Sequence, residues 1–375
     1  MLNECLGIIN LTTKQKVNMS HLTNARPIAS IPIAGRYRIV DFVLSNMVNS
    51  GIRNIGVYTK AKYRSLTDHL SNGKDWDLSR KKGGLYIFSP ENTNVESRYS
   101  HKPGDIHGIF ANIDYIDKSS EEYILIAPSY MICNIDYNEA FEYHKQSKND
   151  ITMIYKTVNN ADKEFKLSAT LVLDEDRVVN MGSNVGILST NNVSMETYIM
   201  KREKFMEYIY ECVTNGDYTY IEDFIADSLK RLQVGSYEHK GYLRCINSLE
   251  SYFEMSKEFL EEDISNELLF SDRKVLTKDQ GQTPTIYTQS ADVENSFIAT
   301  GCVIEGSVKN SIIFRKVHVK PGCVIENSII MKGCEINRDV KLDNVIFDKF
   351  VSIAEGKELK GDKNYPIVIQ KNTSI

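Results

Sequence analysis

The segment from residue 4 to residue 42 has the composition of a strand that leads into a phosphate-binding loop. The apolar run CLGIIN is followed by Lys14 and Lys16, where cationic side chains could meet a phosphate. A loop that wraps phosphate with backbone N–H groups needs glycine, which makes such tight turns without strain. No glycine occurs between Gly7 and Gly35. The segment therefore predicts a solvated polar loop rather than a phosphate cradle.

Histidine and cysteine offer little further chemistry in this chain. His107 could act as a base, but no partner is identifiable, so we expect a polar residue at a helix start. Scattered thiols without a C-x-x-C pair indicate a reduced, cytoplasmic protein with neither a disulfide framework nor a zinc site. The cysteines are odd in number: Cys5, Cys133, Cys212, Cys245, Cys302, Cys323 and Cys334.

Length and composition predict a two-domain protein. The chain has 375 residues, 42% of them hydrophobic and 25% charged, which is enough for two separate cores. Its net charge of −5 makes nucleic acid a poor partner. No apolar run approaches the roughly 18 residues that cross a bilayer, and no secretory signal is recognisable, so no membrane association is expected.

The elements that would position a site alternate between strand and helix in the first two thirds. Strand-like runs such as CLGIIN, IRNIGVYT, YILIAP, DITMIYKTV and SATLVLD are separated by helical patterns at 41–51, 62–73, 105–116 and 137–147. This alternation predicts an α/β fold with a mainly parallel sheet covered on both faces. Ligands of such sheets bind at the carboxyl ends of the strands.

A repeat begins near residue 286. The signatures ENSFI, KNSII, ENSII and DNVIF place asparagines at Asn295, Asn310, Asn327 and Asn344, spaced by 15, 17 and 17 residues. That spacing is typical of a hexapeptide parallel β-helix, and an ordinary antiparallel β domain is the alternative. Terminal coils cannot bury both faces, so docking to another domain or chain is expected. We predict a solvated face from its charged outer positions, which include Lys309, Arg315, Lys316, Lys332 and Arg338.

Three segments resemble glucose-1-phosphate adenylyltransferase (ADP-glucose pyrophosphorylase). They are RPIASIPIAGRYRIVDFVLSNMVNSGIRNIGVYT, GYLRCINSLESYFE and VIENSIIMKGCEINRDVKLDNVIFDKFVSI, and the resemblance covers nearly the whole chain. It implies a Rossmann-like nucleotidyltransferase domain with a mixed, mainly parallel sheet at 1–263, a linker at 264–285 and a left-handed parallel β-helix at 286–375. Members of that family join ATP and glucose 1-phosphate, giving ADP-glucose and pyrophosphate with magnesium held by carboxylates.

The residues that this chemistry needs are replaced. In the alignment with the family's G-G-x-G-T-R-L loop, Asn18 replaces the arginine. In the alignment with R-A-K-P, Ile28 replaces the lysine. Tyr130 and Cys245 occupy the positions of the two metal aspartates, and Asn184 that of the lysine which meets the sugar phosphate. A phenol and a thiol are poor ligands for magnesium, which selects charged oxygens. We therefore expect no catalytic residue, metal ligand or cofactor in this chain.

Two family features remain, with structural roles expected for both. GDIHGIF keeps Gly104 of the family's G-T-A-D-A-V loop, and Asp136 is also retained. A scaffold that persists without its catalytic groups predicts a pyrophosphorylase-like subunit that is inactive by itself.

The chain also looks like the degenerate companion of the catalytic subunit, of the GlgD type, down to NGKDWDLSRKKGGLYIFSP. That resemblance implies a regulatory subunit for glycogen biosynthesis in a cytoplasmic hetero-oligomer, expected to be a tetramer, whose catalytic partner binds the magnesium. Sugar-phosphate effectors of the family meet the arginines of R-A-K-P and G-G-x-Y-R, which are Arg26 and Arg38 here. Arginine's planar fork suits phosphate. The alternative is a structural pair with a carboxylate such as Asp41.

Three other functions are compatible with parts of the sequence. The first is an active glucose-1-phosphate adenylyltransferase with unusual ligands. The second is a hexapeptide acyltransferase, which needs a histidine at a coil turn, whereas the alternation around His318 predicts a strand. The third is a free-standing effector-binding protein. Turnover by the isolated chain and co-purification with a catalytic subunit distinguish among them.

Overall fold

The computed structural model describes residues 2–12, 14, 19–59, 62–89 and 104–375. The chain forms two compact units that interleave in sequence. The first unit comprises residues 1–16, 40–245 and 272–276, and the second comprises residues 17–39, 246–271 and 277–375. This division differs from the linear one expected from the sequence, in which residues 1–263 form one domain.

Long-range contacts within the second unit explain the interleaving. Helix α9 (Leu249–Glu258) is capped by Ser248 and buries the Tyr252 ring, whose hydroxyl donates to the carbonyl of Pro32 at 2.7 Å. Arg26 pairs with Asp348 of the β-helix. The segments 17–39 and 246–271 therefore belong with the C-terminal repeats, although hundreds of residues separate the first of them from these repeats in the chain.

The first unit is built on a nine-stranded mixed sheet. Its strand order is β5 (Gly84–Phe88), β4 (Asn54–Tyr58), β1 (Cys5–Asn10), β6 (Tyr123–Pro128), β11 (Asn191–Lys201), β8 (Ile151–Val158), β12 (Val234–Glu238), β10 (Arg177–Ser183) and β9 (Ala169–Asp174). Strands β5, β4, β1 and β6 run parallel, as does the pair β8–β12, whereas β11 lies antiparallel between β6 and β8. The predicted mixed, mainly parallel sheet is confirmed.

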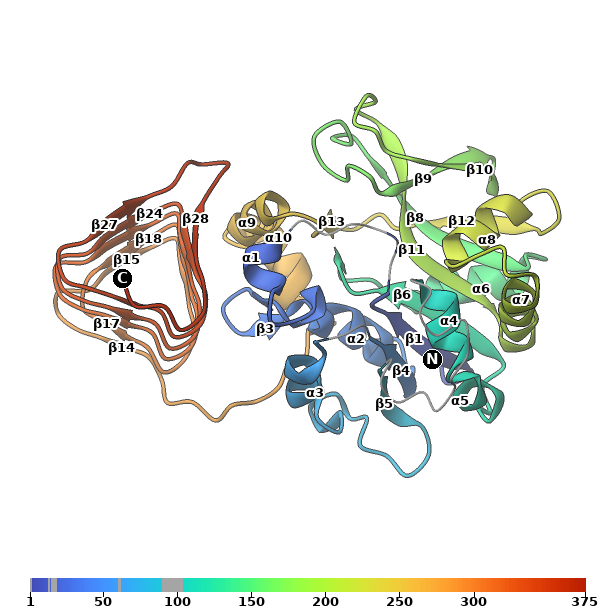
Figure 1. The fold of residues 1–375 in the computed structure, drawn as a ribbon, viewed down its shortest axis with the longest axis horizontal. Coiled ribbons are helices and arrows are strands. Elements are labelled where there is room, and N and C mark those ends of the chain that lie inside the picture. The colour runs from blue at the N-terminus through green and yellow to red at the C-terminus, as the bar shows by residue number, and fades with distance from the viewer. Residues whose placement is uncertain (1, 13, 15–18, 60–61, 90–103) are drawn as a thin grey trace. The chain divides into compact units, whose positions relative to one another are not determined.

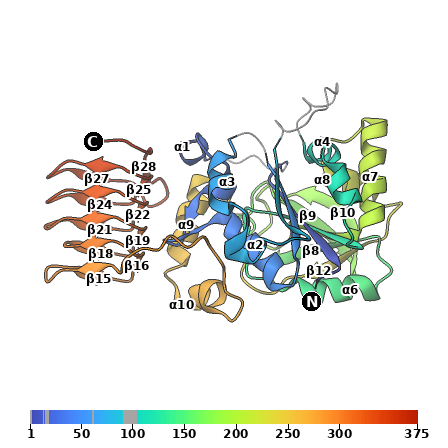
Figure 2. The same cartoon turned by 90° about the horizontal axis from the view of Figure 1, so that it is seen from below.

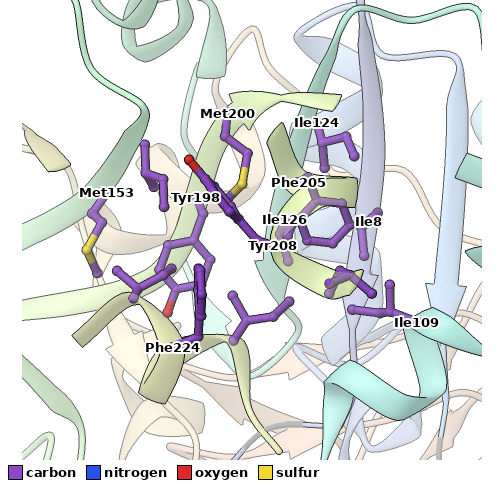
Figure 3. Close-up of a cluster of buried hydrophobic side chains, with 14 of the residues drawn as sticks. Ile8, Ile109, Ile124, Ile126, Met153, Tyr198, Met200, Phe205, Tyr208 and Phe224 are labelled. Atoms are coloured by element: carbon purple, nitrogen blue, oxygen red, sulfur yellow. The ribbon is translucent and has the colours of Figure 1, made fainter. Parts of the chain in front are cut away.

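Four helices cover one face of this sheet: α4 (Asp105–Phe110), α5 (Ile113–Asp117), α7 (Arg202–Asn215) and α8 (Ile221–Ser228). In α7 the buried side chains recur at helical spacing, and the helix ends at Gly216 with φ of 73°. Figure 3 shows Phe205 and Tyr208 of α7 against the isoleucines of β1 and β6. Helix α6 (Tyr137–Gln146) packs on the opposite face, where His144 bonds Thr152 at 2.8 Å.

Helix α2 (Ile39–Asn49) follows the short strands β2 (Pro32–Ile33) and β3 (Tyr37–Arg38). A Cβ at Gly7 of β1 would lie 3.0 Å from Met47 of α2, so glycine permits the close packing of strand and helix. Remaining short elements are α1 (Ser20–Thr23), α3 (Arg64–Leu70), α10 (Glu262–Ser265), the turns Ile28–Ser30, Lys74–Trp76 and Asn266–Phe270, and the pair β7 (Met131–Ile132) with β13 (Arg244–Cys245). Within the described ranges, no helix is long and apolar enough to cross a membrane.

The repeats of the second unit form the predicted left-handed parallel β-helix. Figure 1 looks along its coils, and Figure 2 shows them stacked. The three parallel sheets are β14 (Ile286–Tyr287), β17 (Val303–Ile304), β20 (His318–Val319), β23 (Glu335–Ile336), β26 (Ser352–Ile353); β15 (Asp292–Glu294), β18 (Ser307–Lys309), β21 (Val324–Glu326), β24 (Lys341–Asp343), β27 (Glu358–Lys360); and β16 (Phe297–Ile298), β19 (Ile312–Ile313), β22 (Ile329–Ile330), β25 (Val345–Phe347), β28 (Ile367–Ile369).

The recurring asparagines have a conformational cause. Asn295, Asn310, Asn327 and Asn344 each occupy the left-handed region, with φ between 42° and 52°, at the corner between two sheets. Asparagine tolerates this conformation better than most side chains. His318 lies on a strand, as its alternation predicts, and its imidazole Nε2 is 2.9 Å from Glu305.

Candidate functional site

The carboxyl ends of β1 and β6 mark where a ligand of the first unit would bind. Asn10, the last residue of β1, donates through its side chain to Asp105 at 2.8 Å. Asp105 begins α4 and also accepts the backbone N–H of Ile221, the first residue of α8, at 3.0 Å. The buried carboxyl therefore joins three elements. Burial raises the pKa of Asp105 to about 7, although both hydrogen bonds favour its charged form.

Gly104 is retained for a steric reason. Its φ is 136°, and a Cβ there would lie 2.1 Å from the carbonyl oxygen of Thr219. Any side chain would prevent this close approach of α4 to the segment before α8. Gly104 therefore serves the fold in the described structure.

A small cavity remains among these side chains. It measures about 20 Å³ and is lined by Asn10, Lys14 and the carboxyl-bearing residues Asp105, Glu196 and Glu222, among others. A cavity of this size holds about one water molecule, whereas ligand sites typically measure about 300–1,000 Å³. Among the described residues, the space between these side chains is smaller than a nucleotide needs.

Lys14 meets carboxylates instead of an open phosphate site. Its ammonium lies 2.6 Å from Asp223 and 4.0 Å from Glu222, and the bond to Asp223 raises the pKa of Lys14. Lys16 and Asn18 lie outside the described residues.

The two positions of the family's metal aspartates are brought together. Cys245 in β13 pairs with Met131 of β7, directly after Tyr130, and the Ser168 hydroxyl lies 3.8 Å from the Cys245 sulfur. The Tyr130 ring is buried, and burial followed by the charge of Glu196 raises its pKa far above the ordinary value for a phenol. The sequence alignment therefore identified two positions that converge in space.

Glu196 is a carboxyl of this site that the sequence analysis missed. Strand β11 bulges between Ser194 and Thr197, and Glu196 adopts φ of 49° there. The bulge turns its side chain into the interior beside Tyr130. Burial, and then the charge of Glu222, raises the pKa of Glu196 to about 8. A lone glutamate in the apolar strand NNVSMETYIMK was the available signal.

This donor set does not fit magnesium. Tyr130 presents a neutral phenol, Cys245 a thiol, and Glu196 a carboxyl that is largely protonated near neutral pH because of its raised pKa. Magnesium needs near-octahedral coordination by hard, charged oxygens. Within the described ranges, no cluster of three or more histidine, cysteine, aspartate or glutamate side chains is arranged to hold a metal ion.

Asn184 and Asp136 have structural roles. The Asn184 amide donates to the carbonyls of Ala161 and Phe165 at 2.7 and 3.0 Å and is buried. Asp136 caps α6 by accepting from the N–H of Asn138, as expected. His107 is buried within α4 rather than presented as a base.

A second candidate site lies in the second unit, around Arg26. Arg26 is 6% exposed; its guanidinium donates to Asp348 at 2.7 Å and to the carbonyl of Leu22 at 3.0 Å. Asp41, the carboxylate considered from the sequence, is instead 2.6 Å from His69. The expected structural pairing of Arg26 therefore exists, but with a carboxylate 322 residues away.

A column of cations follows one corner of the β-helix next to this ion pair. The parallel pairing of β19, β22, β25 and β28 aligns Ile313, Ile330, Phe347 and Ile369 on successive coils. Backbone hydrogen bonds just after these strands keep the same alignment: Phe350 N–H donates to the carbonyl of Lys332, and Asn372 N–H donates to the carbonyl of Lys349. This register places four cationic residues on successive coils, about 4.8 Å apart. They form what we call the cationic column: Arg315, Lys332, Lys349 and Lys371.

The solvated face predicted for the outer positions is wrong for Arg315 and Lys332, whereas Lys316 and Arg338 are exposed as predicted. Arg315 is 7% exposed, and Lys332 and Lys349 are half-buried. Burial, and then the charges of Arg38, Arg26 and Lys371, lower the pKa of Lys349 to about 7, and Asp348 opposes that shift. Burial and neighbouring cations, Arg38 among them, also lower the pKa of Lys332. The structure thus brings Arg26 and Arg38 together beside one concentration of positive charge.

The sequence contained a signal for this column. Three of its members lie five residues after a corner asparagine. The pairs are Asn310 with Arg315, Asn327 with Lys332, and Asn344 with Lys349. Lys371 departs from the 17-residue spacing because the last coil is longer: β28 pairs Ile369 with Phe347, 22 residues apart. Such a column can bind a multiply charged anion through charge-assisted hydrogen bonds.

Comparisons with known proteins agree with the two predicted folds. A family model described as nucleotidyl transferase matches residues 18–165, and one described as GlmU-like, C-terminal hexapeptide matches residues 284–365. The glycogen biosynthesis protein GlgD of Bacillus subtilis (strain 168) is 33% identical over 373 residues, 98% of this chain and 96% of the relative. GlgD of Geobacillus stearothermophilus is 36% identical, covering 100% and 98%. A glucose-1-phosphate adenylyltransferase of Bacillus cereus is 28% identical, covering 94% and 93%.

Proposed function

This chain belongs to the family of the glycogen biosynthesis protein GlgD, and on that premise we propose that it is a non-catalytic regulatory subunit of an ADP-glucose pyrophosphorylase. The observation that carries the proposal is the donor set at the degenerate metal positions. Tyr130, Cys245 and a largely protonated Glu196 cannot neutralise the charge that develops during nucleotidyl transfer.

A catalytic partner subunit supplies the missing chemistry in this proposal. The adenylyltransferase relatives, 28% identical over 94% of this chain, support a partner with the same two-part architecture. That partner binds ATP, glucose 1-phosphate and magnesium, and the hetero-oligomer, a tetramer in our proposal, resides in the cytoplasm. The subunit described here has no cofactor of its own.

The regulatory part of the proposal rests on the cationic column. A phosphorylated sugar would place its phosphate among Arg38, Lys332 and Lys349, where neighbouring cations lower the pKa of both lysines. Asp348 beside Lys349 and Asp279 beside Arg315 are carboxylates at the same column. The guanidinium of Arg26 donates a hydrogen bond to Asp348 and so fixes the position of the carboxylate next to Lys349. An effector that binds one assembly state better than another shifts the equilibrium between them. The column thus supports an effector site in which Arg38 contacts the ligand and Arg26 positions it.

The first experiment separates this proposal from the active-enzyme alternative. The purified chain is assayed alone, with ATP, glucose 1-phosphate and magnesium, and then with the catalytic subunit of its own organism. We expect no pyrophosphate release by the chain alone, and a changed activation profile when the two chains form a complex. Brisk synthesis of ADP-glucose by the chain alone would refute the proposal, and failure to associate would favour a free-standing effector-binding protein.

The second experiment addresses the effector site. Lys349→Met and Arg38→Ala are compared with Lys341→Met, a matched change at an exposed strand position in another sheet of the β-helix. In the complex, we expect the first two variants to raise the concentration of sugar phosphate needed for half-maximal response at least tenfold, and Lys341→Met to leave it unchanged. An unchanged response in all three variants would remove the column as the effector site.

A further inference from the structure

The amine of Lys349 differs from that of its neighbour in the cationic column, because it has no hydrogen-bond acceptor. Lys332, one coil earlier, donates its ammonium to the amide oxygen of Gln280 at 2.9 Å. Among the described residues, none accepts a hydrogen bond from the Lys349 amine or forms a salt bridge with it. The Lys349 side chain is also only partly exposed to solvent. A partly desolvated ammonium without an acceptor is unfavourable, so the geometry favours the neutral amine.

The carboxylate that adjoins Lys349 in the chain is engaged elsewhere. One oxygen of Asp348 accepts from the Arg26 guanidinium at 2.7 Å, and the other accepts from the backbone N–H of Lys349, also at 2.7 Å. The Asp348 and Arg26 side chains are both 7% exposed, so their pair is fixed within the protein. Asp348 therefore influences the Lys349 amine through its charge and not through a direct bond.

Positive groups lie near the Lys349 amine on several separate segments of the second unit. Arg26 lies at the start of the chain, Arg38 ends β3, and Lys371 follows β28 on the next coil. Lys332 occupies the previous coil in the same register. Burial, and then these arginines and Lys371, lower the pKa of Lys349 to about 7. A large share of this amine is therefore uncharged at neutral pH.

The charge around this amine determines which reaction suits it. An uncharged lysine amine is a nucleophile, and desolvation beside other cations is one way in which proteins produce it. Condensation with an aldehyde gives an iminium, which keeps a positive charge among the cations, and acylation gives a neutral amide. Addition to carbon dioxide gives a carbamate, whose negative charge guanidinium and ammonium groups stabilise by charge-assisted hydrogen bonds.

We propose that Lys349 is a reversible modification site for carbon dioxide, and that its carbamate lies among Arg38, Lys332 and Lys371 of the cationic column. In this reaction, Nζ forms a bond to the carbon of carbon dioxide, and one C=O electron pair moves onto oxygen. The nitrogen then releases a proton to solvent, which leaves an anionic N-carboxylate. Removal of carbon dioxide reverses the reaction, and no other reactant is required.

The carbamate also connects carbon dioxide to the effector site; this consequence rests on the proposed function. The carbamate places a negative charge among the cations that would otherwise receive the phosphate of a sugar phosphate. Carbon dioxide should therefore compete with the effector. Formation of the carbamate does not itself need a catalytic subunit, so the two parts can be tested separately.

The first test uses the full-length chain at neutral pH, with and without ¹³C-labelled carbon dioxide. A carbamate gives a ¹³C resonance distinct from that of bicarbonate, and alkylation with triethyloxonium fixes it for peptide mass spectrometry. An amine with the ordinary lysine pKa of about 10.4 is almost wholly protonated at neutral pH and does not add to carbon dioxide. We expect trapping at Lys349 to exceed trapping at Lys341, an exposed lysine on β24, at least tenfold. Lys349→Arg, which keeps the positive charge, should abolish the resonance, and Lys341→Arg should retain it.

The second test measures the complex with the catalytic subunit at fixed pH. Raised carbon dioxide should increase the concentration of sugar phosphate needed for half-maximal response, and Lys349→Arg should remove this dependence. Equal trapping at Lys349 and Lys341, or a resonance that survives Lys349→Arg, would overturn the modification site. A trapped carbamate with an unchanged response would overturn the link to the effector alone. If the chains did not associate, the proposed function would fail while the carbamate remained measurable on the isolated chain.

Discussion

The ion pair between Arg26 and Asp348 allows a stringent test of the cationic column. Both side chains are 7% exposed, and their charged atoms are 2.7 Å apart. Asp348→Asn preserves the size of the side chain and removes its charge. The Arg26 guanidinium would then be buried without a counter-charge, next to Arg38 and Lys349.

The expected loss follows from what buried pairs do when one partner is removed. Breaking such a pair typically destabilises a protein by about 3–5 kcal/mol, because the remaining charge stays desolvated. Asp348 also raises the pKa of Lys349 against burial and three nearby cations. Its removal therefore lowers the pKa of Lys349 further, so that this lysine is mainly neutral at pH 7.

The two units can be followed separately in a denaturation experiment. Trp76 is the one tryptophan of the chain and lies fully buried in the first unit. Its fluorescence reports the unfolding of the first unit, whereas far-ultraviolet circular dichroism reports the loss of secondary structure in both units. For Asp348→Asn, we expect the β-sheet dichroism to be lost at lower urea while the Trp76 transition moves little. Asp362→Asn, at an exposed position between β27 and β28, is the matched control.

Phosphate should distinguish an anion site from a purely structural pair. Inorganic phosphate can take the place of the lost carboxylate, so it should stabilise Asp348→Asn more than the wild-type chain. The double variant Arg26→Met with Asp348→Leu should regain most of the stability, because an apolar pair of similar volume avoids the buried charge. A loss below about 1 kcal/mol in Asp348→Asn would refute the reasoning, since exposed pairs contribute about that much.

Three further predictions concern groups with displaced pKa values or buried hydrogen bonds. The pKa of Lys349 is about 7 in the folded chain and about 10.4 when unfolded, so the unfolded state binds more protons between these two pH values. The free energy of unfolding therefore rises with pH in this range. Lys349→Met should remove that rise in urea titrations. The pKa of Glu196 is raised to about 8 in the folded chain and is about 4.3 when unfolded, so the folded state binds more protons between these values and stability falls as the pH rises across this range. Glu196→Gln should therefore be more stable than wild type by about 3–5 kcal/mol at pH 9, as reported by Trp76 fluorescence. Asn184→Ala leaves buried carbonyls without donors and should cost about 2–4 kcal/mol in the same assay. Flat differences across pH, or a neutral Asn184→Ala, would contradict these assignments.

Much of the fold was accessible from local patterns. The 17-residue spacing predicted the β-helix because each coil must return an asparagine to the same corner and an aliphatic residue to the same interior column. Strands such as 5–10 and 123–128 were found because their apolar runs are long and uninterrupted. The helix expected at 105–116 is divided into α4 and α5, because Asn112 leaves helical geometry with φ of −122° and its side chain bonds the carbonyl of Gly108.

The candidate sites were harder to predict because they depend on contacts between distant residues. The alignment with the family identified Tyr130 and Cys245, but the lone glutamate of its apolar strand, Glu196, does not reveal its orientation locally, because that orientation depends on a bulge in β11. Arg26 was recognised as an anion-binding candidate, yet its partner Asp348 lies 322 residues away. Sequence spacing identifies residues that recur, whereas only the folded register shows which of them share a surface.

The cationic column is not required by the β-helix fold. Lys309 of β18 lies between Asp292 and Glu294 of the neighbouring strand β15, so this cation is balanced by carboxylates in the adjacent coil. At the corner of Lys332 and Lys349, neighbouring cations and burial lower the pKa of both lysines, which means that the folded chain without a ligand is destabilised there. A bound anion would relieve that repulsion and raise both pKa values. Binding should therefore take up protons near pH 7, and the affinity for phosphate should fall as the pH rises above 7, a dependence that calorimetry in buffers of different ionisation enthalpy can measure.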